Sequence, residues 1–109
     1  MIRITIYRNR DEIISGFESL GHAGFAEAGE DIVCAGVSAL VLNAVNSVEA
    51  FTEDSYEVET DAESGLISLM FTHKPSKEAT LLMKSLILGL EGIRDAYGDE
   101  FISLISKEV

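Results

Sequence analysis

The sequence predicts an α+β domain in which two helices pack on one face of a mainly antiparallel sheet. Short stretches in which apolar and polar residues alternate are typical of half-buried strands, and longer stretches with apolar residues three or four positions apart are typical of helices. These stretches follow in the order strand, strand, helix, strand, strand, helix, strand, with no repeat or linker between them. Strand pairs with short links favour antiparallel hairpins, and the helices then cover one face of the sheet.

The first hairpin is predicted over residues 2–21. Ile2, Ile4 and Ile6 alternate with Arg3, Thr5 and Tyr7, which indicates a strand with one buried face. Polar residues 8–11 form the turn, and residues 12–21 form a second, less regular strand. Its pattern breaks at Gly16, which is typical of a β-bulge.

A loop and a long helix follow the hairpin. Small residues predict a loop over residues 23–30 that is mobile without a ligand. Asp31 is a good N-cap for a helix over residues 32–51, because its carboxylate accepts a hydrogen bond from a first-turn amide. One stripe of this helix is predicted to face the core; its members are Val33, Val37, Leu40, Ala44, Val48 and Phe51.

The second half of the chain repeats the pattern of two strands and a helix. Residues 56–61 form a strand with one acidic face, residues 62–65 form a turn, and residues 67–71 form the next strand. Pro75 and Ser76 begin the second helix, and residues 101–107 add a fifth strand. The second helix is apolar around more than one face, which is more apolar surface than one sheet covers. We therefore expect a homodimer.

The composition is that of one small domain over residues 1–109. Hydrophobic residues make up 47% and charged residues 25% of the chain, which is ordinary for a soluble protein. A single cysteine permits no internal disulfide. The N-terminus begins as a strand rather than a signal peptide, and no apolar run reaches the roughly 18 residues needed to span a membrane. We expect a cytoplasmic protein that does not bind membranes.

The strongest candidates for chemistry are His22 and Cys34. With Asp31 as the cap, Cys34 falls at the third helical position, where free amides and the helix dipole favour a thiolate, although the charge of Asp31 opposes this. A cysteine near a base is an activated nucleophile. A lone cysteine on an apolar helix is, however, usually a small buried hydrophobe. The spacing alone therefore leaves both interpretations open.

The run GHAGFAEAGEDIVCAGVSALVLNAVNSVE, residues 21–49, resembles the ribosomal-processing cysteine protease (Prp) family of bacteria. Members of that family have a Gly-His pair, a flexible loop, a cysteine at the start of a helix and a serine four residues later. The resemblance implies that His22 is the general base and Cys34 the nucleophile. It also implies the substrate, the short N-terminal extension of a large-subunit ribosomal protein (number twenty-seven), with aromatic residues near the cut.

Four further residues are candidates for supporting roles. Gly21, Asp31 and Ser38 match motif positions of the family, and Asp31 or Ser38 could orient the imidazole. Ser38 could equally bond to its own helix backbone. Phe25 is either a substrate-contacting lid residue or a loop anchor to the core.

The net charge of −11 argues against nucleic acid as a direct partner, because phosphate contacts need a basic surface. The acidic residues either form a solvated face or attract a basic protein. This leaves two rivals to a protease: a non-catalytic acidic binding module for a basic ribosomal protein, and a thiol redox sensor. One cysteine and two separated histidines have no recognisable metal-ligand spacing, so no metal or cofactor is expected. Many acidic residues lie close together in the middle of the chain: Glu49, Glu53, Asp54, Glu57, Glu59, Asp61 and Glu63.

Overall fold

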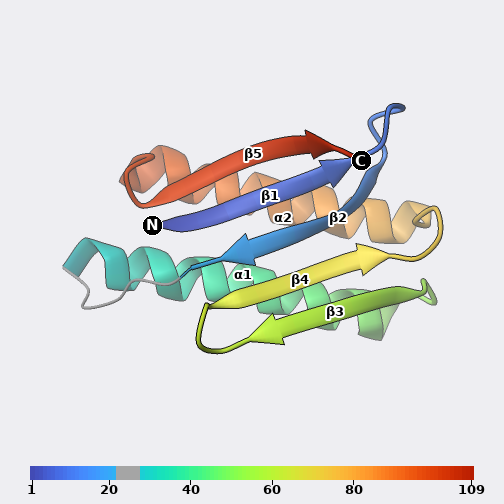
Figure 1. Cartoon of the computed structure of the whole chain (residues 1–109), viewed down its shortest axis with the longest axis horizontal. Helices are drawn as coiled ribbons and strands as arrows, with labels where there is room; N and C mark the ends of the chain where they lie inside the picture. The colour runs from blue at the N-terminus through green and yellow to red at the C-terminus, as the bar shows by residue number, and fades with distance from the viewer. Residues whose placement is uncertain (22–27) are drawn as a thin grey trace.

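The computed structural model describes residues 1–21 and 28–109, with the side chains of residues 28–31 left aside. Five strands form one sheet in the order β3-β4-β2-β1-β5, and both helices lie on the same face of it (Figure 1). This confirms the predicted α+β fold and its order of elements. The elements are β1 (Ile2–Arg8), β2 (Ile14–Leu20), α1 (Ala28–Phe51), β3 (Tyr56–Asp61), β4 (Leu66–Phe71), α2 (Lys77–Tyr97) and β5 (Ile102–Glu108).

The sheet is antiparallel except at one edge. The pairs β1–β2, β2–β4 and β3–β4 are antiparallel, whereas β5 runs parallel to β1. A parallel neighbour requires a crossover connection. Here the chain crosses the sheet through α2 before it returns as β5 beside β1 (Figure 1).

The core lies between the sheet and the two helices. On β1 the predicted alternation is confirmed, because Ile2, Ile4 and Ile6 are all buried. Valine side chains of α1 and longer side chains of α2 pack against them, and together these elements bury one continuous cluster. The helical members of this core are Val33, Val37, Val41, Ala44 and Val48 from α1, and Ala79, Met83, Leu86 and Leu90 from α2.

The predicted core stripe of α1 is wrong in two places. Leu40 is only half-buried, and the neighbouring Val41 is fully buried in its place. Phe51 is 74% exposed. It is the last residue of the helix, and the chain leaves through Thr52, whose amide and hydroxyl both donate to the Val48 carbonyl. Phe51 is left on the outer side of this last turn.

A β-bulge in the first hairpin confirms the break predicted at Gly16. The pairing shifts between Tyr7, which faces Gly16, and Arg8, which faces Ile14. Here the backbone of β2 also passes close to β4. A Cβ atom on Gly16 would overlap the Leu69 carbonyl oxygen and would lie 2.9 Å from the Met70 Cα. Glycine is therefore required at this position by the neighbouring strand.

The second helix starts where it was predicted. Ser76 is its N-cap and accepts a hydrogen bond from the Ala79 amide at 3.0 Å. Asp54, in the link between α1 and β3, accepts hydrogen bonds from both the amide and the hydroxyl of Ser76. Partial burial acts to raise the pKa of Asp54, but the hydrogen bonds from Ser76 outweigh it and lower the pKa below its ordinary value.

The expectation that no apolar run is long enough to span a membrane is wrong for one segment of α1. Residues Ile32–Phe51 form a 20-residue stretch with a mean hydropathy of 1.6, which is long and apolar enough to span a membrane by length and composition. In this fold, however, the stretch carries the valine side chains that pack on the sheet. The core helix of a folded domain can have the same length and apolar composition, so the segment is weak evidence for a membrane span.

We expect Gly16→Ala to destabilise the protein by about 1–3 kcal/mol, the usual range for overpacking, because its Cβ would meet backbone atoms of β4. The matched control is Gly92→Ala in α2, where an added Cβ meets nothing within 4 Å. This control should be stabilised by about 0.5–1 kcal/mol, because alanine favours a helix interior. Urea denaturation of the three proteins measures both effects, and equal stability of wild type and Gly16→Ala would contradict the close approach.

We also expect the bond between Asp54 and Ser76 to make stability depend on acid pH. The pKa of Asp54 is lower in the folded than in the unfolded protein. Ionised Asp54 therefore stabilises the fold fully above its pKa in the unfolded chain, about 3.9, and this stabilisation is lost as the pH falls through its pKa in the folded protein. Asp54→Asn should therefore be less stable than wild type by about 1 kcal/mol at pH 7. Urea denaturation from pH 7 to pH 3 should show this difference shrinking below about pH 4. A constant difference would contradict the assignment.

Candidate active site

Cys34 lies on α1 and is half-buried beside the core. The predicted start of this helix is wrong. The helix begins at Ala28, so Asp31 is its fourth residue rather than its N-cap, and residues 28–30 belong to the helix and not to the predicted loop. Ala28 and Glu30 are good helix formers, and they extend the helix although Gly29 lies between them. Cys34 is therefore the seventh helical residue, beyond the free amides of the first turn.

The Cys34 side chain lines a cavity of about 290 Å³. Four parts of the chain enclose it, and they gather at one end of the molecule (Figure 1). They are the start of β1, the end of β2, residues 34–42 of α1 and the hairpin between β3 and β4. Apolar side chains form much of the wall, and few polar groups interrupt them. The α1 wall is Cys34, Val37, Ser38 and Leu42, and the wall from the β3–β4 hairpin includes Thr60, Asp61, Ala62, Gly65, Leu66 and Ile67.

The structure brings together three of the predicted site residues. Cys34, Ser38 and Gly21 all line this cavity, with Ser38 one turn after Cys34 on the same helix. Gly21 follows β2, and its backbone adopts a φ of 96° that favours glycine. A Cβ atom there would lie 2.7 Å from the Met1 carbonyl oxygen, so the position also has no room for a side chain.

The other predicted residues lie outside the described part of the chain. His22 and Phe25 are not among the described residues, and neither is the Asp31 side chain. His22 nevertheless follows Gly21 directly in the sequence, and Gly21 is a wall of the cavity that Cys34 lines.

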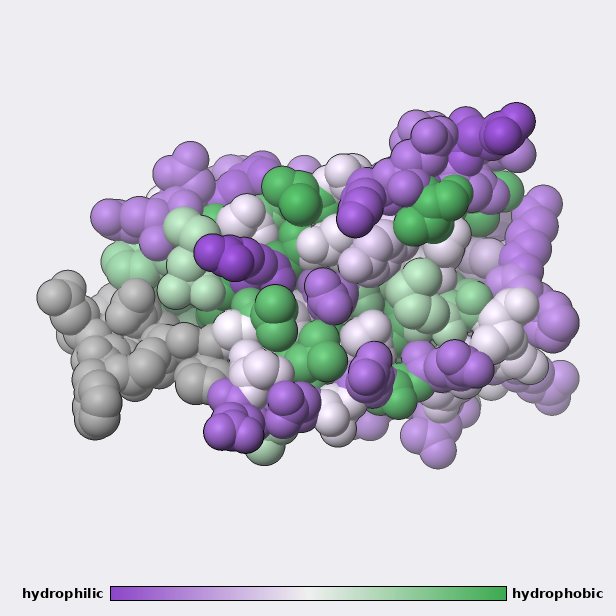
Figure 2. Space-filling model, in the orientation of Figure 1, coloured by the Kyte–Doolittle hydropathy of each residue, from purple (hydrophilic) through white to green (hydrophobic). Residues whose placement is uncertain are grey.

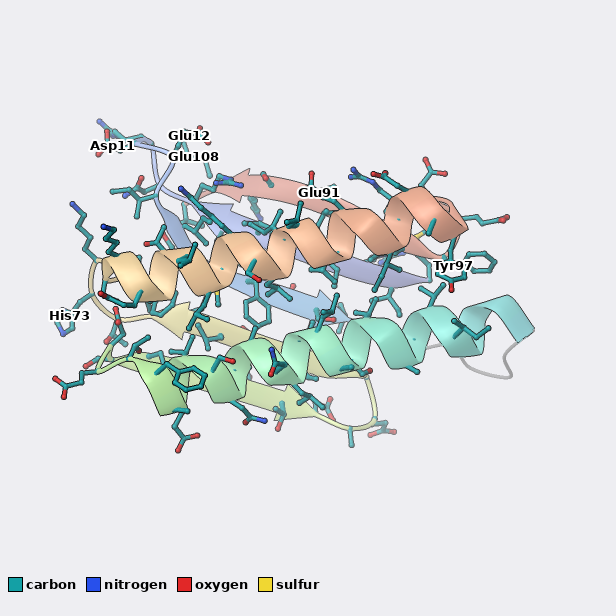
Figure 3. All side chains as sticks on the ribbon, turned by 180° about the vertical axis from the view of Figure 1, so that it is seen from behind. Asp11, Glu12, His73, Glu91, Tyr97 and Glu108 are labelled. Atoms are coloured by element: carbon teal, nitrogen blue, oxygen red, sulfur yellow. The ribbon has the colours of Figure 1, made fainter. Side chains whose placement is uncertain are left out.

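The second histidine of the chain lies at the opposite end of the molecule. His73 follows β4 and lies at the end of the molecule away from the start of α1 (Figure 3). It borders a separate cavity together with Phe51 and Asp54. Cys34 and Phe51 are seventeen positions apart on α1, which is about 25 Å of helix. His73 is exposed and is too distant to act on Cys34. The chain has two histidines, so an imidazole that reaches Cys34 within one protomer belongs to His22.

Sequence reasoning did not find the residues of the β3–β4 turn that line the cavity. The pattern Asp61-Ala-Glu-Ser-Gly65 is a visible turn signature. Nothing in it indicates that the turn lies beside Cys34, because that proximity arises only when β4 pairs with β2. Among the described residues, no group of three or more His, Cys, Asp or Glu side chains is arranged to hold a metal ion.

Sequence comparison relates nearly the whole chain to one family. The family model described as "Cysteine protease Prp" matches residues 1–102. The ribosomal processing cysteine protease Prp of Bacillus subtilis is 39% identical over 103 residues, which cover 91% of this chain and 92% of that protein.

Solved structures give the same relation. The ribosomal processing protease Prp from S. aureus in complex with a substrate peptide superposes with a TM-score of 0.90 at 29% identity, and with a covalently linked product peptide it superposes with a TM-score of 0.87 at 30% identity. Both alignments cover 98% of this chain and 100% of the other.

Proposed function

The chain belongs to the cysteine protease Prp family, and we propose on this basis that it is an endopeptidase with Cys34 as nucleophile and His22 as general base. The observation that carries this assignment is the cavity that Cys34 shares with Gly21, the residue directly before His22. The distance of His73 from this cavity supports His22 as the base. The enzyme class follows from the family, and the two residue roles are the proposal.

In the proposed reaction, His22 accepts the proton of the Cys34 thiol, and the thiolate attacks the carbonyl carbon of the scissile peptide bond. The tetrahedral intermediate collapses as the C–N bond breaks, and His22 gives its proton to the leaving amine. The resulting thioester is hydrolysed by a water molecule from which His22 takes a proton, and Cys34 is regenerated. The half-buried thiol beside an open cavity suits this sequence, because a substrate carbonyl can reach it from the cavity.

The proposed substrate is the short N-terminal extension of a large-subunit ribosomal protein, number twenty-seven. Relatives of the chain are named ribosomal processing proteases, and one of them has been solved with a substrate peptide. The cavity supports an apolar or aromatic side chain near the scissile bond, since Val37, Leu42 and Leu66 contribute to its wall. We also place the protein in the cytoplasm, where ribosomal proteins are assembled; cell fractionation tests this location.

Phe25, Ser38 and Asp31 are proposed to support the reaction. Ser38 lies on the wall of the cavity one turn after Cys34, which suits a role in orienting the imidazole or the substrate. Asp31 is a second candidate for orienting the imidazole. Phe25 is proposed to contact the substrate peptide, and Phe25→Ala should then raise KM for that peptide. An unchanged KM would contradict this role.

The acidic edge of the sheet favours a second candidate function, a binding module for a basic ribosomal protein. Glu57 and Glu59 are exposed on β3, which is an edge strand, and neither takes part in the ion pairs of the described residues. On the face of the sheet that the helices leave uncovered, hydrophilic side chains lie along this edge (Figure 2). Together with the net charge of −11, this edge would attract a basic partner and raise its association rate. An enzyme can use the same attraction, so cleavage decides between the two functions.

We expect the purified protein to cleave a peptide that copies the ribosomal extension, and we expect Cys34→Ala and His22→Ala to lose at least about 1,000-fold in kcat, because nucleophile and base act as a unit. His73→Ala is the matched control and should cleave as wild type does. Mass spectrometry of the products and steady-state kinetics measure these effects. Binding of the peptide without cleavage by wild type, lost at high salt, would favour the binding module.

We propose that the protein forms a homodimer through its helical layer. Leu81 and Leu88 are 66% and 71% exposed on α2, two helical turns apart, and Leu42 is exposed on the neighbouring α1. Leu81→Glu and Leu88→Glu should each shift the mass measured by light scattering from dimer to monomer at micromolar concentration, because a carboxylate in an apolar interface is costly to desolvate. Ile105→Glu, on the other face of the sheet, is the control and should remain dimeric. A monomeric wild type would contradict the proposal.

A further inference from the structure

We propose that the turn between β3 and β4, residues 61–65, positions the backbone that leads into His22, with Asp61 as the positioning residue. This inference rests on the proposed roles of His22 and Cys34. It adds a positioning contact from outside residues 21–49, made by the β3–β4 hairpin, which follows these residues in the sequence.

The turn is held in shape by the Asp61 side chain. One carboxylate oxygen of Asp61, Oδ1, accepts a hydrogen bond from the Glu63 amide at 3.2 Å. The other, Oδ2, accepts one from the Ser64 hydroxyl at 2.9 Å. Gly65 completes the turn with a φ of 71°, a conformation that favours glycine. Asp61 therefore restrains the Glu63 amide and the Ser64 side chain, on the residue whose carbonyl faces Gly21.

Ser64 in turn holds the residue before His22. The Gly21 amide donates a hydrogen bond to the Ser64 carbonyl oxygen at 3.1 Å. On its other side Gly21 lies against the N-terminal residue, as the 2.7 Å from a hypothetical Cβ to the Met1 carbonyl oxygen indicates. Gly21 is thus held between Met1, which precedes β1, and the β3–β4 turn, and a displacement of Ser64 would move the backbone that leads into His22.

The same turn is a wall of the Cys34 cavity. Asp61 and Gly65 line it together with Gly21 and Cys34. The hydrogen bond between Asp61 and Ser64 is exposed to solvent. Exposed bonds of this kind contribute little to global stability. Its loss should therefore change catalysis, which depends on the placement of His22, far more than it changes folding.

The test compares Asp61→Ala with Asp61→Asn. We expect Asp61→Ala to lower kcat for the ribosomal peptide by about 10- to 100-fold, since a displacement of roughly 1 Å in a catalytic group costs about 100-fold. KM should stay near that of wild type, and Tm should stay within about 3 °C. Asp61→Asn keeps an acceptor for the Glu63 amide and should restore most of kcat.

The matched control is Asn9→Ala in the β1–β2 turn. The Asn9 side chain accepts hydrogen bonds from the Asp11 and Ile13 amides, so it holds its turn as Asp61 does, but at the opposite end of β2 (Figure 1). This variant should keep the kcat of wild type. If Asp61→Ala has the kcat of wild type, the turn does not position His22. If Asp61→Asn loses as much as Asp61→Ala, the charge of Asp61 acts directly, and the positioning role is overturned.

A second measurement tests the role of Asp61 independently of the proposed peptide substrate. Alkylation of Cys34 by iodoacetamide needs no peptide, and it is faster when a base favours the thiolate. We expect slower alkylation in Asp61→Ala than in wild type, approaching the rate of His22→Ala. Failure of wild type to cleave the ribosomal peptide would contradict the proposed substrate alone. Equal alkylation rates in wild type and Asp61→Ala would overturn the positioning role, whatever the cleavage result.

Discussion

The packing of α1 on the sheet is the constraint on which the rest of the structure depends. Four valines of this helix are buried on the inner face of the sheet and fix the rotation of the helix about its axis. Cys34 directly follows Val33, one of these valines, and is therefore left at the margin of the core, half-buried and open to one cavity. β-branched side chains hold few rotamers, which makes this face rigid. A thiol on a rigid helix at the margin of a core is both accessible and well placed for a nucleophile.

The two ends of the molecule serve different purposes. At one end, α1, β2 and the β3–β4 turn enclose the cavity that holds the thiol. At the other end, Asp54 binds the N-cap of α2 and ties the link after α1 to the start of the second helix. His73 lies at this second end. The Cys34 cavity and the capped start of α2 are thus separated by the length of α1.

The hydrogen bond between Gly21 and Ser64 joins two parts of the chain that sequence reasoning treated separately. Gly21 directly precedes the candidate base His22, whereas Ser64 belongs to a turn with an ordinary composition. The pairing of β2 with β4 brings them together. The close approach at Gly16, on the same pair of strands, shows how tightly this pairing is set. The wall of the candidate site is therefore a consequence of sheet order as much as of the motif.

The sequence by itself determined the order of elements, the buried face of β1, the cap of α2 and the candidate pair His22 and Cys34, because each depends on residues close together or on a motif. It misplaced the start of α1, because the capping signal at Asp31 is local and the helix extends past it to Ala28. It also misplaced Phe51 and Leu40, because burial at a helix end depends on what lies beneath it. Only the tertiary structure decided that the β3–β4 turn lines the Cys34 cavity and that His73 lies far from it. Such proximities arise from strand pairing between distant residues, which no local pattern in the sequence encodes.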